Sequence, residues 1–241
     1  MKNNGISSLL FSLSYAIGVV IGLYLIVIAG WADMESAFYG FTRLGDSGLD
    51  GFSCPVLMTR AETRMISLTV SNTTDRRLNP TIKTDISTPV VMSEVFETIE
   101  LAPGESKTLK WSVGPENIDL ERFIFAKALM FSAYPLPSQE VTCGIFILDL
   151  PGSGRVILAV LVALSLLGMS WGLYGLSKIG ASNQWLKAHI RPMLFLEIVI
   201  ISGFVVSFMV GWVPSILILA VAVLLIVILL SSLLMNENIK P

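Results

Sequence analysis

Four apolar runs in this chain are each long enough to cross a lipid bilayer as a helix. The hydrocarbon core of a bilayer is roughly 30 Å thick, and about 20 apolar residues of helix span it. Hydrophobic residues make up 54% of the chain and charged residues only 14%, well below the roughly 25% of a soluble domain. We therefore predict a membrane protein with four transmembrane helices, over residues 9–30, 156–176, 193–211 and 215–235.

The first run is longer than the apolar part of a cleaved signal peptide, which has about 7–15 residues. Small residues in "AGWAD", at the end of the run, leave cleavage open as an alternative, but the length favours an uncleaved anchor. Under either interpretation the residues that follow are exported. The segment between the first two runs is long enough for one small domain.

The short segments that flank these runs carry Lys and Arg, which stay on the cytoplasmic side of a membrane. These residues are Lys2, Lys178, Lys187, Arg191 and Lys240, and a four-span chain puts all of them on one side. We expect a multi-pass plasma-membrane protein whose N-terminus (1–8), 177–192 loop and C-terminal tail (236–241) are cytoplasmic, with residues 31–155 outside. Arg155, at the outer end of the second run, is the exception.

Within the 177–192 loop, the stretch "SNQWLKAHIR" predicts a short interfacial helix that Ser182 caps. Its Lys187 and Arg191, together with Lys178, are expected to face the anionic headgroups of the bilayer. A plain connecting helix is the alternative, and it places these side chains in much the same way.

The segment between the first two runs predicts an antiparallel β-sandwich, so the fold class is an α+β membrane protein. In "RMISLTVSN" and "KTLKWSV" apolar and polar residues alternate, which is the pattern of strands with one buried face. "RFIFAKALMFSAY" is apolar on both faces and indicates a central strand, while turn sequences such as "APGES" separate the strands. Six or seven short strands in about 100 residues are typical of an immunoglobulin-like sandwich. We place it at residues 54–150, after a glycine-rich linker at 31–53.

The order of "VSNTT" and then "IELAPGESKTLKWSV" resembles the extracytoplasmic immunoglobulin-like repeats of prokaryotic surface proteins, the CARDB and NEW3 type. In those repeats an Asn ends one strand and an "LxPGE" turn precedes a later one. The resemblance covers about residues 60–148 and rests on turn residues. It implies an adhesive or spacer domain, and it extends to no family for the whole chain.

The chain has two cysteines, and both lie in the segment assigned to the outside. Disulfides persist in oxidising compartments, so we predict a bond between Cys54, near the start of the domain, and Cys143, near its end. Closing a loop of about 90 residues stabilises a fold by up to about 4–5 kcal/mol in the chain-entropy model. Two separate thiols are the alternative, and two cysteines alone make a poor metal site.

Three short motifs point to chemistry, and each is incomplete. "GDSG" at 45–48 matches the nucleophile motif of trypsin-like proteases, but the only histidine, His189, lies in the cytoplasmic loop. "DSGLDG" lacks the glutamate that ends a calcium loop, and only a weak site is left open. "LPGSG" resembles a sortase signal, yet two further spans follow the one beside it. We expect no catalytic residues, no metal site and no cofactor.

Glu197 is the one carboxylate inside a predicted span, about one helical turn into the third. Ionisable residues inside membranes are candidates for function. The interpretation we favour is structural pairing with Lys178, Lys187 or Arg191 near the cytoplasmic interface. A proton or ion role and a contact between subunits are the alternatives.

Small residues recur at helical spacing in three of the four runs, and such faces let helix backbones approach closely. The rows are Ser14, Gly18 and Gly22; Gly168, Gly172 and Gly175; and Gly203, Ser207 and Gly211. The first two rows lie at matching depth on helices of opposite direction, so we predict that they pack together, most tightly near Gly18 and Gly172. The third row is expected to meet the fourth span or a partner helix. The general abundance of glycine in membrane helices is the alternative explanation.

These features favour a non-enzymatic accessory or scaffold subunit whose outer domain binds another protein. The formal charge of −2 lacks the basic excess of a nucleic-acid binder. A surface receptor or sensor for a glycan or small ligand is the main alternative, and a small transporter or enzyme that uses Glu197 and His189 is a third. The expected partners are the lipid bilayer and other membrane subunits.

Overall fold

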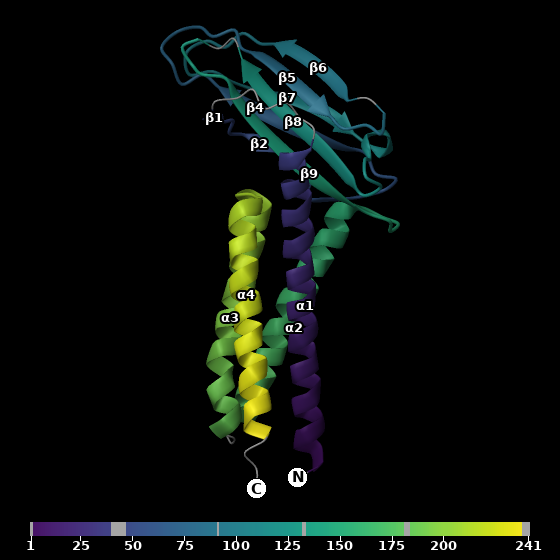
Figure 1. The fold of residues 1–241 in the computed structure, drawn as a ribbon, viewed down its shortest axis with the longest axis vertical. Coiled ribbons are helices and arrows are strands. Elements are labelled where there is room, and N and C mark those ends of the chain that lie inside the picture. The colour runs from purple at the N-terminus through teal and green to yellow at the C-terminus, as the bar shows by residue number, and fades with distance from the viewer. Residues whose placement is uncertain (1, 40–46, 91, 132–133, 181–183, 238–241) are drawn as a thin grey trace. The chain divides into compact units, whose positions relative to one another are not determined.

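The computed structural model of the chain has a helical unit and a β unit (Figure 1). The residues that it describes are 2–39, 47–90, 92–131, 134–180 and 184–237. The helical unit comprises Met1–Gly30 and Leu158–Pro241, and the β unit comprises Trp31–Ile157. The chain therefore begins and ends in the helical unit, and the β unit is inserted between its first two helices.

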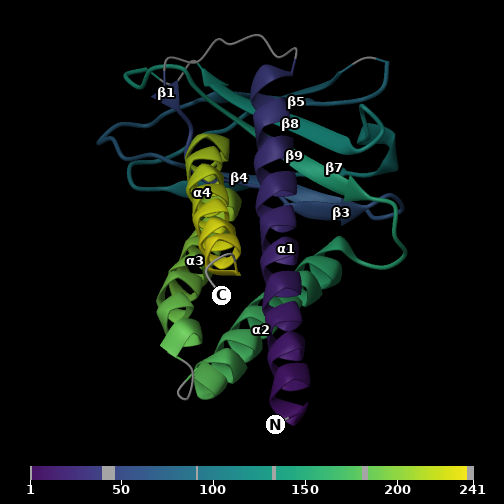
Figure 2. The ribbon, with the colours of Figure 1, turned by 60° about the horizontal axis from the view of Figure 1, so that its bottom comes forward.

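Four helices in the described residues are long and apolar enough to cross a membrane, which confirms the number of predicted spans. They are α1 (Lys2–Phe38), α2 (Gly154–Gly180), α3 (Gln184–Met209) and α4 (Trp212–Glu237). In the helical unit, α3 and α4 run side by side as an antiparallel pair, and α2 crosses α1 (Figure 2). The chain reverses between α3 and α4 at Gly211, whose φ of 125° is accessible to glycine.

All four helices extend beyond the limits that hydropathy predicts, α1 and α3 by the most. α1 continues through residues 31–38, the start of the predicted linker, because "WADMESAF" contains good helix formers and neither glycine nor proline. α3 begins at Gln184, so the predicted interfacial helix and the third span form one helix, with Pro192 inside it. In a soluble protein a proline at this place would predict a helix boundary. Membrane helices tolerate an internal proline, so the helix continues through it. Ser182, the predicted cap, lies outside the described residues.

Two sheets form the β unit. The larger has the order β1-β9-β8-β5-β6, with β3 also paired to β9, and the smaller has the order β2-β4-β7. The strands are β1 (Ser47–Gly48), β2 (Phe52–Ser53), β3 (Leu57–Thr59), β4 (Arg64–Ser71), β5 (Thr81–Ile86), β6 (Ser93–Thr98), β7 (Ser106–Val113), β8 (Phe123–Phe131) and β9 (Gln139–Leu148). Unlike the other neighbours, β1 and β3 pair with β9 in parallel. The arrangement is therefore mixed and not purely antiparallel as predicted, because alternation in a sequence reports burial and not strand direction.

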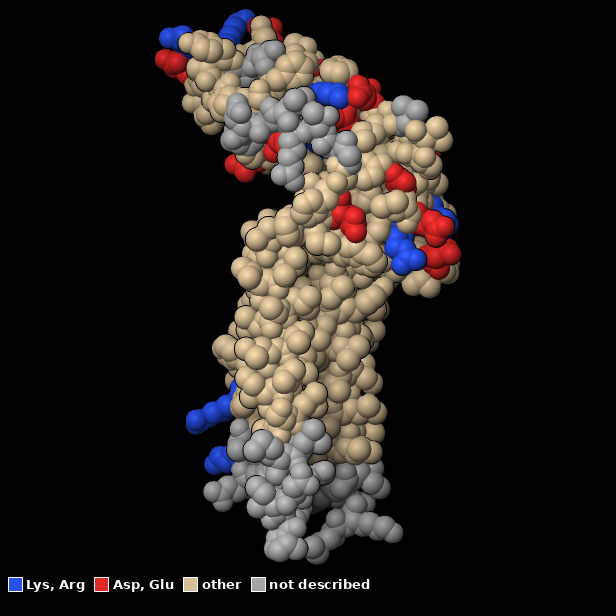
Figure 3. Space-filling view, in the orientation of Figure 1, with Lys and Arg blue, Asp and Glu red and all other residues tan. Residues whose placement is uncertain are grey.

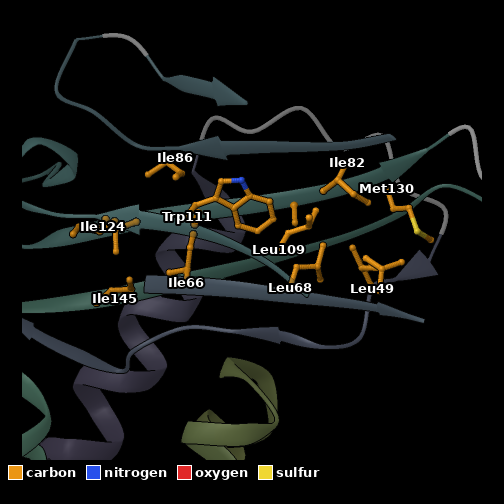
Figure 4. Packing of buried hydrophobic residues seen from close by; sticks show 14 of the residues in the cluster. Leu49, Ile66, Leu68, Ile82, Ile86, Leu109, Trp111, Ile124, Met130 and Ile145 are labelled. Atoms are coloured by element: carbon orange, nitrogen blue, oxygen red, sulfur yellow. The ribbon is translucent and has the colours of Figure 1, made fainter. Parts of the chain in front are cut away.

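The core of the β unit lies between the two sheets (Figure 4). The alternating apolar residues of β4 and β7 predicted strands with one buried face. Each of these residues is at most 7% exposed in the structure. They are Ile66, Leu68, Val70, Leu109, Trp111 and Val113. β8 lies between β9 and β5 and is buried on both faces, as expected of a central strand. The Trp111 indole N–H donates to Glu97 Oε1 at 2.8 Å, which satisfies the polar atom of that ring.

The last turns of α1 pack on the β9 and β8 part of the larger sheet. Gly144 of β9 lies so close to Ala32 that a methyl group in its place would overlap the Ala32 carbonyl. The Trp31 ring packs edge-on against Phe123, with ring centroids 5.3 Å apart. Residues 31–38 are therefore an integral part of the β unit and not a flexible tether to it.

Candidate functional site

α1 and α2 approach each other closely at the predicted small residues. A methyl group added at Gly18 would lie 2.7 Å from both the Met169 amide nitrogen and the Ser165 carbonyl oxygen. The Ser165 hydroxyl donates to the Gly18 carbonyl at 2.7 Å. The Ser14 hydroxyl likewise donates to the Gly168 carbonyl at 3.1 Å. Backbone contact and two hydrogen bonds between helices hold this α1–α2 seam together.

The seam continues along α2 at the other two glycines of the second row. A methyl group at Gly172 would lie 2.6 Å from the Phe11 carbonyl oxygen and 2.7 Å from Tyr15 Cβ, and one at Gly175 would overlap the Phe11 ring. At the opposite end, a methyl group at Gly22 would lie 2.8 Å from the Ser165 hydroxyl. The structure thus brings together the faces of α1 and α2 that carry the two rows, and at Gly22 the nearest atom is already Ile200 Cγ2 of α3.

The register of the seam differs by about one helical turn from the predicted pair of Gly18 and Gly172. Gly18 lies opposite Gly168, since a methyl group on Gly168 would be 3.2 Å from the Gly18 Cα. Residues four apart share one helix face, so the sequence identifies the faces that meet but not which turns align.

The third row contacts α1 as well as α4. A methyl group at Gly203 would overlap Ile26 of α1 and would lie 3.4 Å from Ile218 Cγ2 of α4. Ser207 is buried, and its hydroxyl has no hydrogen-bond partner among the described residues. Gly211 forms the turn into α4. The predicted contact with the fourth span is present, but the sequence-based expectation omitted α1.

Hydroxyl side chains that sequence reasoning missed connect the helices of this unit. Ser165 and Ser170 of α2 hydrogen-bond to α1 and α3, and the Tyr15 hydroxyl of α1 donates to the Met193 carbonyl of α3 at 2.6 Å. A hydroxyl residue in an otherwise apolar run could have indicated these contacts, because hydroxyl groups in a membrane hydrogen-bond to the backbone or to a neighbouring helix.

Glu197 is only 7% exposed and lies on the side of α3 that faces α2. The Ser170 hydroxyl donates to Glu197 Oε1 at 2.7 Å. Of the described ion pairs, none joins Glu197 to Lys178, Lys187 or Arg191. The described partner of Glu197 is therefore the Ser170 hydroxyl and not one of the three basic residues that we favoured.

A groove of about 370 Å³ lies beside Glu197, between α2 and α3. Apart from Glu197, its lining residues are Ser170, Leu173, Tyr174, Ser177, Ile190 and Leu194. His189 does not line it and has its Nε2 atom 3.0 Å from the Ser232 hydroxyl of α4. The two residues that a transporter or enzyme would use therefore face different helices.

Charged side chains are sparse on the helical unit. In Figure 3 neutral residues cover most of its visible face, and Lys or Arg side chains project near one end. The predicted basic residues Lys178, Lys187 and Arg191 are all exposed. The Lys178 Nζ atom lies 4.6 Å from the centroid of the Tyr174 ring, a cation–π contact at the rim of the groove.

In the β unit, Cys54 and Cys143 form the predicted disulfide. Cys54 directly follows β2, whereas Cys143 lies in β9, 89 residues further along the chain. Both side chains pack against the core. The bond therefore ties the beginning of the β unit to its last strand.

Polar contacts around Glu62 anchor the start of α2 within the β unit. Glu62 accepts hydrogen bonds from the Gly154 N–H at 2.8 Å, from Arg64 Nε at 2.6 Å and from the Ser153 hydroxyl at 3.1 Å. Burial raises the pKa of this carboxyl, but the donors outweigh burial and hold the pKa below its ordinary range. The carboxylate also lies at the positive end of the α2 dipole. Sequence reasoning missed Glu62 because Gly154 is 92 residues away.

The short motifs show no site in the part of the chain that the structure describes. Residues 45 and 46, which begin "GDSG" and "DSGLDG", lie outside that part. Among the described residues, no three His, Cys, Asp or Glu side chains are grouped closely enough to hold a metal ion. The Gly152 carbonyl of "LPGSG" accepts a hydrogen bond from the Thr59 hydroxyl at 2.8 Å, so this motif forms the turn into α2.

Comparisons with known proteins identify no family. No protein-family model matches the sequence, and no curated protein matches it. Among solved structures, a β-glucosidase from Erythrobacter marinus is similar over 41% of this chain and 15% of its own, with 19% identity and a TM-score of 0.28. A likeness at that score is distant and carries no argument about activity or about an immunoglobulin-like identity of the β unit.

Proposed function

We propose that the chain is a non-enzymatic accessory or scaffold subunit of a membrane assembly, whose β unit lies outside the cytoplasm and binds another protein. The observation that carries this proposal is the outer face of β4 and β7 in the smaller sheet. Its outward-pointing side chains are Met65, Ser67, Thr69, Ser71, Ser106, Thr108, Lys110 and Ser112.

This outer face is built from small hydroxyl residues and carries a single charge, Lys110. The hydroxyls of Thr69 and Thr108 lie 2.9 Å apart, and those of Ser71 and Ser106 lie 2.8 Å apart, so they hydrogen-bond to each other across the strands. The cores of protein interfaces are depleted in charged residues. Sites for small ligands are concave. It is therefore the openness and the low charge of this face, and not its serine content, that suit a protein partner better than a small ligand.

The partner is sought by affinity purification of the full chain from native membranes in a mild detergent, followed by mass spectrometry. We expect stoichiometric co-purification of other membrane subunits with the wild type and their loss with Thr108→Arg. Thr98→Arg is the matched control, because Thr98 is also exposed and pairs with the Thr81 hydroxyl on the larger sheet. A clean monomer, or equal loss with both variants, contradicts the proposal.

The orientation is supported by the exposed basic residues at the end of α2 and the start of α3 and by the disulfide of the β unit. It is tested with a membrane-impermeant maleimide on whole cells. Thr98→Cys is expected to react in intact cells, whereas Lys187→Cys is expected to react only after the membrane is opened. The reverse labelling pattern would place the β unit in the cytoplasm.

A further inference from the structure

The groove beside Glu197 is an open depression between two antiparallel helices. On α2 the residues that line it, from Ser170 to Ser177, share one helix face. On α3 they run from Ile190 to Glu197 in the same way. Seven residues of helix rise about 10 Å, so the groove is about that long. Glu197 and Ser170 lie at the end of the groove that is further from the α2–α3 connection, which we call its inner end. The end nearest that connection is its rim.

The carboxylate at the inner end is short of partners. The described residues supply Glu197 with one hydrogen bond, from Ser170, and with no cation at ion-pair distance. A charge with 7% exposure in a low-dielectric site is costly unless it is paired. Because the groove is open beside it, a cationic group from outside the chain can reach this carboxylate.

The aromatic residues of α2 indicate the depth of the groove in a bilayer. Trp171 and Tyr174 are 65% and 57% exposed. Exposed Trp and Tyr on membrane helices mark the level of the lipid headgroups. Ser170 is next to Trp171 in the chain, and its partner Glu197 lies about one helical turn into the predicted third span, so a headgroup that enters the groove can reach the carboxylate.

A second charge of opposite sign lies at the rim. The Lys178 ammonium folds back over the Tyr174 ring, one of the walls of the groove. Tyr174 is one helical turn, about 5.4 Å, from Ser170. The groove thus offers an anion at its inner end, a cation at its rim, and apolar walls at Leu173 and Leu194.

We propose that this groove binds the headgroup of a zwitterionic lipid with a primary amine, of the ethanolamine phospholipid type. Its ammonium donates to Glu197, its phosphate accepts from Lys178, and an acyl chain follows the apolar wall. A choline headgroup has no N–H to donate and is held by cages of several aromatic rings. Tyr174 is the one aromatic ring among the described residues that line this groove. The inference is independent of the protein partner proposed for the β unit.

Native mass spectrometry of the full chain, released from nanodiscs of equimolar ethanolamine and choline phospholipid, tests the proposal. We expect the wild type to retain the ethanolamine lipid about tenfold more than the choline lipid, a difference of roughly 1.4 kcal/mol. Glu197→Gln is expected to abolish this preference. Glu121→Gln, the same change at an exposed residue of the β unit, is expected to keep it.

Lys178→Gln is the second variant, since Lys178 is exposed and the change leaves the packing of the helices intact. It is expected to weaken retention of both phospholipids but to keep the order between them. Soluble phosphoethanolamine in excess is expected not to displace the lipid, because it lacks an acyl chain. Displacement by it would assign the site to a free phosphate ester instead.

Equal retention of the two lipids by the wild type overturns the proposal, and so does a preference that survives Glu197→Gln. Loss of a co-purified membrane subunit from Glu197→Gln, without any lipid preference in the wild type, would instead assign the carboxylate to a partner helix.

Discussion

A single methyl group at Gly18 is expected to loosen the helical unit. An added Cβ there would lie 2.7 Å from two backbone atoms of α2, and backbone atoms cannot move aside as a flexible side chain can. Gly30→Ala provides a matched control on the same helix. There the added methyl would have the Ser215 Cβ at 3.4 Å as its nearest neighbour, an ordinary contact distance.

The expected magnitude follows from the difference between the two variants. Both gain the helix propensity of alanine over glycine, so that contribution cancels. Overpacking at Gly18 destabilises by about 1–3 kcal/mol. The two hydrogen bonds across the seam weaken as well, each worth about 0.6 kcal/mol in a membrane. Together these give a difference in unfolding free energy of about 2–4 kcal/mol, or roughly 30- to 700-fold in the unfolding equilibrium.

The assay is reversible unfolding of the purified full chain in mixed micelles, followed by circular dichroism as the denaturing detergent is increased. Gly18→Ala is expected to unfold at a clearly lower detergent fraction than Gly30→Ala. Cysteines placed at 18 and 168 are expected to crosslink in the folded chain. A Gly18→Ala variant as stable as Gly30→Ala would refute the close backbone contact that defines the seam.

Three further perturbations test the β unit. Reduction of the Cys54–Cys143 disulfide is expected to lower the unfolding free energy by up to about 4–5 kcal/mol, measured by thermal denaturation with and without reductant. Finding both cysteine thiols free in protein from intact cells would contradict the presence of the disulfide. Because folding lowers the pKa of Glu62, its stabilisation is present at neutral pH and is lost as acid protonates the carboxyl. Glu62→Gln is expected to flatten that acid dependence in urea unfolding. Gly144→Ala is expected to expose residues 31–38 to hydrogen exchange, whereas Gly48→Ala, with open space around its Cβ, is expected not to.

Properties that depend on neighbours along the chain were determined by the sequence alone. The four spans follow from hydropathy over about 20 residues, which is a one-dimensional quantity. The buried faces of β4 and β7 follow from alternation, since successive side chains of a strand point to opposite faces. The disulfide partners followed from the count, because only Cys54 and Cys143 are available.

Properties that depend on which distant segments meet were decided by the tertiary structure. α1 continues past the hydrophobic run to Phe38, and the buried Ala32 in this extension packs on Gly144 of β9, a contact that no local hydropathy signal records. β1 and β3 share the edge of β9 in parallel, although their sequences carry no mark of direction.

The same distinction explains the outcome at Glu197. Its position in an apolar run identified it from the sequence as a candidate. Its neighbour could not be read there, because Ser170 lies on another helix. Of the basic residues nearby, Lys187 and Arg191 are exposed, and Lys178 lies over the Tyr174 ring. A long charged side chain in a membrane reaches toward water, so closeness along the chain overestimates its pairing with a buried carboxylate. The packing of α2 against α3 instead presents a hydroxyl to the carboxylate and leaves a groove beside it.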